Sequence, residues 1–238
     1  MEVRCGFTAD CLAADGDALV CIGGDGDAST VSVYSASRGE AVRHLRGHTD
    51  KVTCVACEGD VIASSGRDKT IRLWSRESGA CTAAFGSGDE VAYGLALRGG
   101  LLLCGEGLSA PASGLRAMAR LWQLNERCTV AQARAMLEEH LEPIRSVALT
   151  ESLAITASQD GVVCVWELPG RAGESSRDEG ADEREPSQSR EAVTTYSSVA
   201  RFEHPAGFFL GCVDAAGDLM ATGCGDGRVR LWSLSTRQ

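Results

Sequence analysis

The sequence has no long hydrophobic run. Its apolar stretches, such as those at residues 101–104 and 208–210, are far shorter than the roughly 20 residues that a membrane-spanning helix needs. The first residues include Glu2 and Arg4, and no apolar segment of signal-peptide length follows them. We therefore expect no membrane span and no secretion, and we expect the protein in the cytoplasm, the nucleus or both.

Paired cysteine spacing and excess positive charge are also missing. The 11 cysteines are scattered singly, which favours free thiols buried as small apolar groups over a disulfide framework. Lys and Arg number 23 against 33 Asp and Glu, which gives a net charge of −10. Nucleic-acid binders depend on attraction between basic side chains and phosphates, so we expect no direct nucleic-acid ligand.

What the chain does have is a repeat built around its four tryptophans. Each tryptophan ends a short run that alternates in polarity or is rich in β-branched residues, at residues 70–74, 118–122, 162–166 and 228–232. This pattern is typical of half-buried β-strands. Strands recurring at this spacing predict an all-β repeat fold.

Three of the tryptophans share a set of polar residues at fixed distances. An Asp stands six residues before the tryptophan, a Ser or Thr stands four residues before the Asp, and a His stands about 20 residues before the Asp. Buried polar groups must be paired, so such a set fixes one geometry when its hydrogen bonds are complete. We predict three structural tetrads: His48, Ser64, Asp68 and Trp74; His140, Thr156, Asp160 and Trp166; and His204, Thr222, Asp226 and Trp232.

The sequence Gly47-His48, followed by Asp68 and by Leu73-Trp74, resembles the WD-repeat (WD40) family. Residues 47–85 match its pattern best. The resemblance implies four-stranded blades arranged as a β-propeller. The chain departs from the pattern in two ways: no tryptophan is followed by Asp, and Glu139 and Glu203 stand where Gly precedes His in the family.

The repeat predicts a propeller of about five four-stranded blades, at residues 8–46, 47–86, 87–137, 138–203 and 204–238 with 1–7. In the first blade Tyr34 takes the place of Trp and Thr8 lies near the place of His. In the third blade Ser87 stands where His is expected, and an insertion at 106–116 replaces the turn Asp. Residues 1–7 are a candidate fourth strand that closes the ring. A fragment of a larger propeller and one half of a composite ring remain alternatives.

Two segments do not follow the repeat. Residues 169–192 contain hardly any large apolar side chain and 11 charged ones, so we expect a disordered acidic insertion within the fourth blade. Residues 131–141 have a helical composition, although the repeat requires a fourth strand near Val130 or Met136. The sequence leaves strand and short helix open there.

Catalytic and metal-binding interpretations of the polar residues are weaker than a structural one. His48, His140 and His204 fall in separate blades and cannot converge on one metal ion. The set of Ser or Thr, His and Asp recurs three times, whereas a catalytic site needs one copy with an accessible nucleophile. We therefore expect no enzyme activity, no metal and no cofactor.

The resemblance implies a non-enzymatic scaffold or adaptor that binds proteins or peptides on its faces. Residues beside the turn Asp and after the His are the candidates for partner binding: Arg67, Lys51, Asp50, Gln159, Glu142 and Arg145. Arg67 leads because Arg suits bidentate recognition of acidic groups. The second repeat is similar to repeats in substrate-recruiting subunits of ubiquitin ligases. The alternatives are a structural subunit of a ribosome-biogenesis or other RNA-containing assembly, and a propeller-based enzyme.

Overall fold

Side chains along each strand point alternately to the two faces of its sheet, and apolar side chains on both faces are buried. In β7 (Thr70–Ser75), Ile71 and Leu73 point to one side of the sheet and Trp74 to the other, and all three are buried. A computed structural model describes residues 9–23, 28–87, 90–107, 117–125, 127–129, 131–168, 194–205 and 208–236. These residues form twenty strands and no helix. The predicted all-β fold is confirmed.

The strands form five sheets. The first contains β1 (Ala9–Asp15), β2 (Ala18–Gly23), β3 (Val31–Ser35) and β4 (Glu40–Leu45), and the second contains β5 (Val52–Glu58), β6 (Val61–Gly66), β7 and β8 (Cys81–Gly86). The third contains β9 (Ala92–Arg98), β10 (Leu101–Glu106), β11 (Ala117–Leu124), β12 (Ala131–His140) and β16 (Thr194–Tyr196). The fourth contains β13 (Ile144–Leu149), β14 (Leu153–Ser158), β15 (Val162–Glu167) and β17 (Ala200–Glu203), and the fifth contains β18 (Leu210–Ala216), β19 (Leu219–Cys224) and β20 (Val229–Ser233).

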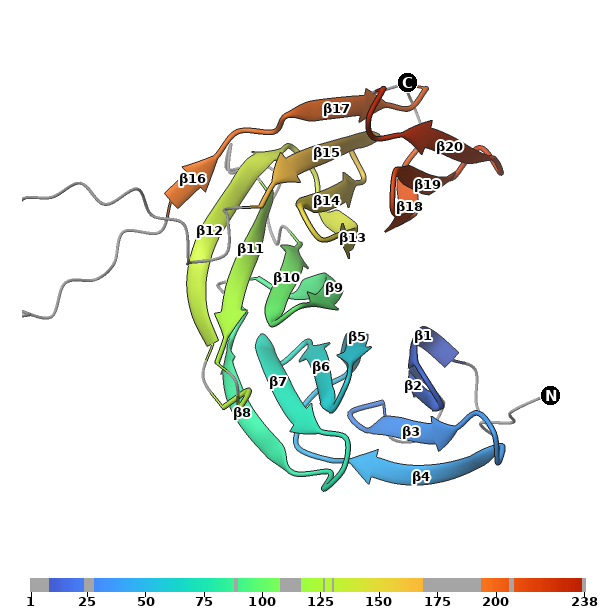
Figure 1. Cartoon of the computed structure of the whole chain (residues 1–238), viewed down its shortest axis with the longest axis vertical. Coiled ribbons are helices and arrows are strands. Elements are labelled where there is room, and N and C mark those ends of the chain that lie inside the picture. Colours follow the sequence, from blue (N-terminus) through green and yellow to red (C-terminus); the bar gives the residue numbers. More distant parts are fainter. Residues whose placement is uncertain are drawn as a thin grey trace, which may run out of the picture.

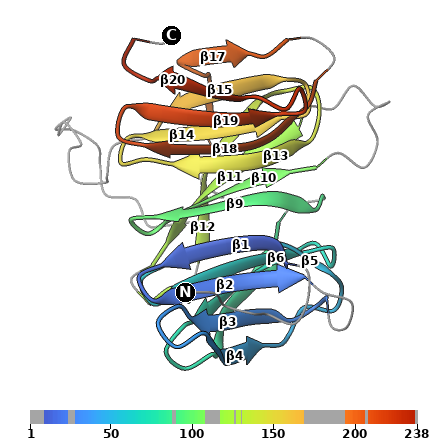
Figure 2. The same cartoon turned by 90° about the vertical axis from the view of Figure 1, so that its right-hand side faces the viewer.

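The sheets lie around a common centre with the first strand of each sheet innermost (Figure 1). β1 packs on β5, β5 on β9, β9 on β13, and β13 on β18. Seen from the side, the sheets follow one another along the molecule (Figure 2). They form an arc that opens between the fifth sheet and the first (Figure 1). This is the architecture of a β-propeller.

Four apolar clusters lie between neighbouring sheets and form the core. Between the first and second sheets, Val31 and Val33 pack with Ile62 and Trp74. The other three junctions are built in the same way, with a Trp face of one sheet against an aliphatic face of the next. Apolar burial of this kind is the main stabilising contribution to folding.

The third sheet settles the open question at residues 131–141. This segment is the strand β12, which pairs with β11 in the register Arg120↔Met136 and Leu121↔Ala135. Pairing with β11 and burial of Ala135 and Leu137 outweigh the weak helical preference of the segment. β16 adds a fifth strand, parallel to β12, although its position in the sequence lies within the range expected for the fourth blade.

Several expectations fall outside the described residues. These are the closing strand at 1–7, Thr8 near the place of a His, most of the insertion at 106–116, and the acidic insertion at 169–192. Ring closure through the N-terminal segment therefore stays a prediction. Among the described residues, no helix has the length and apolar character to cross a membrane.

Candidate functional site

In the second sheet four polar side chains form one continuous hydrogen-bonded chain. Trp74 donates its indole Nε1–H to Ser64 Oγ at 2.8 Å, and Ser64 Oγ lies 2.8 Å from His48 Nε2. His48 Nδ1 lies 2.9 Å from Asp68 Oδ2. Asp68 also accepts the backbone N–H groups of Thr49 and Thr70. The chain ties the loop before β5 to the turn between β6 and β7.

The protonation of this network follows from its geometry. Because Asp68 is a carboxylate, His48 donates from Nδ1, accepts at Nε2 from the Ser64 hydroxyl, and stays neutral. Burial lowers the pKa of His48, which agrees with a neutral ring. Burial alone would raise the pKa of Asp68, but hydrogen bonds from Thr70, Thr49 and His48 outweigh it and lower the pKa to about 2.

The fourth sheet repeats the arrangement. Trp166 Nε1 donates to Thr156 Oγ1 at 3.1 Å, and Thr156 Oγ1 lies 2.7 Å from His140 Nε2. His140 Nδ1 lies 3.2 Å from Asp160 Oδ2. Asp160 has a lowered pKa, because the interactions with His140 and two backbone N–H groups outweigh the effect of its burial.

The fifth sheet brings three of its four predicted residues together. Trp232 Nε1 donates to Thr222 Oγ1 at 2.9 Å, and Thr222 Oγ1 lies 3.1 Å from His204 Nε2. Asp226 instead accepts hydrogen bonds from Arg230 at 2.6 and 3.2 Å. The hydrogen bond with Arg230 lowers the pKa of Asp226.

In the third sheet a thiol takes the position of the hydroxyl. Trp122 Nε1 donates to Cys104 Sγ at 3.3 Å, and burial raises the pKa of Cys104 to about 12. Glu106, which is 2% exposed, pairs with Arg120 at 2.6 Å. Sequence spacing missed Cys104 because the insertion at 106–116 moves it further from Trp122. The pairing of β10 with β11 shows that Cys104 is equivalent to Ser64. Cys104 lies opposite Arg120, and Ser64 lies opposite Arg72, which is likewise two residues before a tryptophan.

A second recurring contact lies at the other end of the sheets, where sequence analysis missed it. The carboxylates of Asp17, Asp60 and Asp218 each accept the backbone N–H of the residue three positions after the Tyr or Trp, at 2.6, 2.7 and 2.6 Å respectively. The signal was available, because each Asp follows a Gly in the turn between the first two strands of its sheet.

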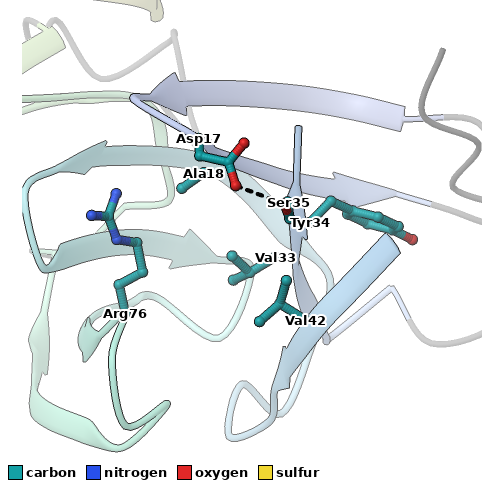
Figure 3. Close-up of a pocket in the computed structure, with 7 residues that line it drawn as sticks. All are labelled: Asp17, Ala18, Val33, Tyr34, Ser35, Val42 and Arg76. Carbon is teal, nitrogen blue, oxygen red and sulfur yellow. Dashed lines mark hydrogen bonds between the residues drawn. The ribbon is translucent and has the colours of Figure 1, made fainter. Parts of the chain in front are cut away.

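A pocket of about 260 Å³ lies beside Asp17 in the first sheet (Figure 3). Ser35 donates to Asp17 at 2.6 Å, and Arg76 of the second sheet reaches Asp15. The charged side chains at this pocket are therefore engaged within the chain, and Asp17 belongs to the recurring turn contact. The lining residues are Asp17, Ala18, Val33, Tyr34, Ser35, Val42 and Arg76.

The candidate partner-binding residues lie at the same end of their sheets, on a side of the arc that we name the loop face. It consists of the loops that lead into the inner strands and the turns between the second and third strands. Backbone hydrogen bonds join the two: Arg67 N donates to Lys51 O, Gln159 N to Pro143 O, and Gly225 N to Phe209 O. Arg67, Asp50 and Glu142 are exposed, whereas Lys51, Gln159 and Arg145 are half-buried.

Some of these side chains are held in place by neighbours. Lys51 pairs with Asp10 of the first sheet at 2.7 Å. The guanidinium of Arg145 lies 4.6 Å from the ring centre of Tyr93 on the third sheet, a cation–π contact. With its amide oriented to satisfy both groups, Gln159 accepts from Arg145 Nε and Nη2 at 3.1 Å each. Compared with Lys51, Arg145 and Gln159, Arg67 has greater freedom to contact a partner.

Sequence analysis missed the aromatic part of the loop face. Phe208 and Phe209 are 43% and 57% exposed, and the ring of Phe209 lies over Gly225. The backbone oxygen of Phe208 lies close to Gly161 in the neighbouring turn of the fourth sheet. Phe209 occupies the position that Pro143 holds in the fourth sheet.

Within the described residues, no group of three or more His, Cys, Asp or Glu side chains is placed to hold a metal ion. The two complete sets of Ser or Thr, His and Asp are buried: Ser64, Thr156 and His140 are each 0% exposed. A nucleophile in such a position does not meet a substrate.

Comparison with a family model finds the WD domain, G-beta repeat, in three places, at residues 39–75, 132–167 and 197–233. These ranges contain the tryptophans of the second, fourth and fifth sheets. The first of them also includes the network of His48, Ser64, Asp68 and Trp74.

Three curated proteins are similar to this chain in sequence. Mitochondrial division protein 1 of Schizosaccharomyces pombe is 26% identical over 208 residues, which are 86% of this chain and 26% of that protein. WD repeat-containing protein pop1 of the same species is 52% identical over 40 residues, 17% of this chain and 5% of that protein. Periodic tryptophan protein 2 of Saccharomyces cerevisiae is 38% identical over 68 residues, 28% of this chain and 7% of that protein. The chain spans only about a quarter of the length of the first of these curated relatives.

Among solved structures, the computationally designed Ika4 protein is similar in fold. Its TM-score is 0.57 at 18% sequence identity, and the match covers 71% of this chain and 99% of that one.

Proposed function

Because the chain belongs to the WD-repeat β-propeller family, we propose that it is a non-enzymatic scaffold that binds other proteins through its loop face. WD-repeat proteins in general serve as platforms for protein interaction. The buried sets of Ser or Thr, His and Asp stabilise turns, since they recur in separate sheets and are closed to substrate. Rigid turns favour binding, because less freedom is lost when a partner docks.

The observation that carries the proposal is the chemistry of the loop face. It combines an exposed guanidinium, Arg67, with two exposed aromatic rings, Phe208 and Phe209. Arg and aromatic residues are enriched in the energetically important parts of protein interfaces. The partner segment that fits best places an acidic group against Arg67 and an apolar group against the two rings.

The test is affinity purification of the tagged full chain with quantitative mass spectrometry. Arg67→Glu and Phe209→Asp are each expected to reduce a bound partner at least tenfold. Arg38→Glu is the matched control, because Arg38 is also exposed but lies in the turn between β3 and β4, at the opposite end of its sheet. A partner retained equally by all three variants would refute loop-face binding.

Two finer assignments are distinguished by the same experiment. Recruitment of substrates to a ubiquitin ligase predicts that ligase subunits are retained, while the substrate is lost with Arg67→Glu. A subunit of an RNA-containing assembly, in the cytoplasm or nucleus, predicts that partners are released by ribonuclease or by raised salt. The net charge of −10 favours the first of these over direct contact with RNA.

A further inference from the structure

The inner strand of every sheet begins with a β-bulge at the loop face. In each case the pairing with the second strand of the sheet skips one residue, as it does between Ile144 and Ser146 in β13. A bulge re-aims the side chain of the extra residue, and bulges are common next to functional sites. The extra residues occupy equivalent positions in the five sheets: Asp10, Thr53, Tyr93, Arg145 and Gly211.

Arg145 is the only cation at these five positions. The Thr53 hydroxyl lies 2.6 and 3.0 Å from two backbone oxygens, so it is used within the chain. Asp10 pairs with Lys51, and its charge is thereby neutralised. Tyr93 provides the ring on which the guanidinium of Arg145 lies. The bulges therefore place one positive charge on an aromatic support.

Neutral groups hold this guanidinium in place. The ring of Tyr93 supports its plane, and the amide oxygen of Gln159 accepts from its Nε and Nη2. By contrast, Arg120 and Arg230 are each paired with a carboxylate. Among the residues that the structure describes, no carboxylate pairs with Arg145 and no acceptor is bound at the edge between Nη1 and Nη2. A carboxylate matches such an edge with two parallel hydrogen bonds.

Exposed apolar side chains flank the turn that holds Arg145. The turn lies between β14 and β15, and its residue Gln159 binds the guanidinium. The next residue, Asp160, accepts the backbone N–H of Leu141 at 3.0 Å, and Gly161 lies close to the backbone oxygen of Phe208. Leu141 is 65% exposed and Phe208 is 43% exposed. One tight turn thus brings a fixed cation beside apolar side chains from two segments of the chain.

The second sheet shows that the fold does not require these side chains. There Thr49 takes the place of Leu141, and Thr53 takes the place of Arg145. The bulge and the turn form in both sheets. The cationic and apolar groups of the fourth sheet therefore add a surface rather than a structural contact.

We propose that the turn patch, which consists of Leu141, Arg145, Phe208 and Phe209, binds a linear segment of a partner protein that carries Asp or Glu close to a large apolar residue. The carboxylate binds the open edge of Arg145, and the apolar side chain lies against the leucine and the two rings. An extended segment fits because residues close together along it reach both sides of a single turn. The assignment rests on the proposed loop-face function, to which it adds a second acid-binding residue besides Arg67 and the class of partner.

Display of random peptides tests the specificity of the patch. The purified full chain is immobilised, and bound peptides are enriched over several rounds and sequenced. The expected consensus is an acidic residue within a few positions of Phe, Leu or Met. Enriched peptides without an acidic residue, or no enriched peptide, would overturn the proposal.

A double-mutant cycle then tests the contact with Arg145. An enriched peptide and its acid-to-amide analogue are labelled with fluorescein, and fluorescence polarisation measures their affinities for the wild type and for Arg145→Met. Each single change is expected to weaken binding about tenfold or more, whereas the amide peptide should bind both proteins equally. Arg145→Lys keeps the charge but loses the two-pronged contact, so it should also weaken binding of the acidic peptide. Circular dichroism verifies that each variant is folded.

The matched control is Arg98→Met. Arg98 belongs to the inner strand β9 but lies at its opposite end, where it pairs with Glu151. Its replacement should leave both affinities unchanged. If Arg145→Met weakened the amide peptide as much as the acidic one, the contact would be rejected. Binding that is lost with Arg67→Glu and Phe209→Asp but kept with Arg145→Met would reject the turn patch and leave loop-face binding standing.

Discussion

Arg230 holds Asp226 through two hydrogen bonds, at 2.6 and 3.2 Å, and it also lies 3.4 Å from His204 Nδ1. Because the guanidinium only donates, Nδ1 of His204 must accept and its Nε2 must carry the proton. His204 Nε2 then donates to Thr222. The ring is thus in the tautomer opposite to that of His48, whose Nδ1 faces a carboxylate.

This relationship predicts a change of tautomer in an Arg230→Cys variant, which copies Cys164 of the fourth sheet. Without the guanidinium, Asp226 is free to accept from His204 Nδ1, as Asp68 does from His48. The pKa of His204 should also rise, because burial and the charge of Arg230 both lower it in the wild type. Nitrogen-15 NMR of the histidine rings measures both quantities. His48 is the internal control, and an unchanged His204 tautomer would contradict the assignment.

Removal of the hydroxyl in the second sheet should be costly. Ser64→Ala leaves both His48 Nε2 and Trp74 Nε1–H without a partner in a buried site. Each unsatisfied buried group costs about 1–3 kcal/mol, so for two groups we expect a loss of about 2–6 kcal/mol in the free energy of unfolding. Urea denaturation measures it. Ser64→Thr is the control, because Thr156 and Thr222 fill the same place in other sheets; a loss as large as that of Ser64→Ala would count against the network.

The carboxylate of Asp68 should make stability depend on pH in acid. Its folded pKa of about 2 lies below its ordinary value of 3.8. The unfolded chain therefore binds this proton first, so the contribution is complete above about pH 4 and is lost as the pH falls towards 2. Asp68→Asn should cost about 1–2 kcal/mol at pH 7, and its difference from the wild type should shrink over that window in denaturation experiments. Glu77→Gln, at an exposed turn, is the control variant.

The buried histidines should add an earlier step. Burial lowers the pKa of His48 and of His204 from 6.5, so below that pH the unfolded chain takes up protons that the folded chain resists. Stability should decline between about pH 6.5 and 5, before the carboxylates titrate. Flat stability over that range would mean that the rings are accessible to protons in the folded state.

The sequence was sufficient for the all-β fold, because strands with the same periodicity recur before each tryptophan, and in three repeats the turn Asp stands six residues before it. It did not predict the hydrogen bonds made by residues that are not part of the repeating set. Arg230 takes the position of Cys164, and nothing in the spacing shows that its guanidinium reaches Asp226. Cys104 was hidden by the insertion, and only the register of β10 with β11 reveals it.

The strand β16 shows a second limit. It lies near β12 only because the chain leaves the fourth sheet and returns beside the third, a parallel pairing between residues about 59 positions apart. Local propensity carries no information about such a pairing. The aromatic pair on the loop face was hidden for a similar reason, since exposure of Phe208 and Phe209 depends on where the neighbouring turn lies.

The turn between β6 and β7 offers a stabilising substitution. Lys69 adopts a φ of 60°, where the equivalent positions of the fourth and fifth sheets carry glycine: Gly161 at 82° and Gly227 at 76°. All three donate their backbone N–H to the residue three positions earlier, so the turns have the same form. A left-handed conformation costs a residue with a Cβ roughly 1–2 kcal/mol, of which glycine's greater unfolded-state freedom offsets about 0.4–1. Relief of the backbone strain in Lys69→Gly should therefore favour folding by about 0.5–1 kcal/mol. The interaction that Lys69 makes in the wild type opposes this gain, and urea denaturation measures the sum. The reciprocal Gly227→Lys places its Cβ in open space, so only backbone strain acts, and it should destabilise by a similar amount. If Lys69→Gly were instead destabilising, the side chain of Lys69 would have to make contacts worth more than the relief of strain.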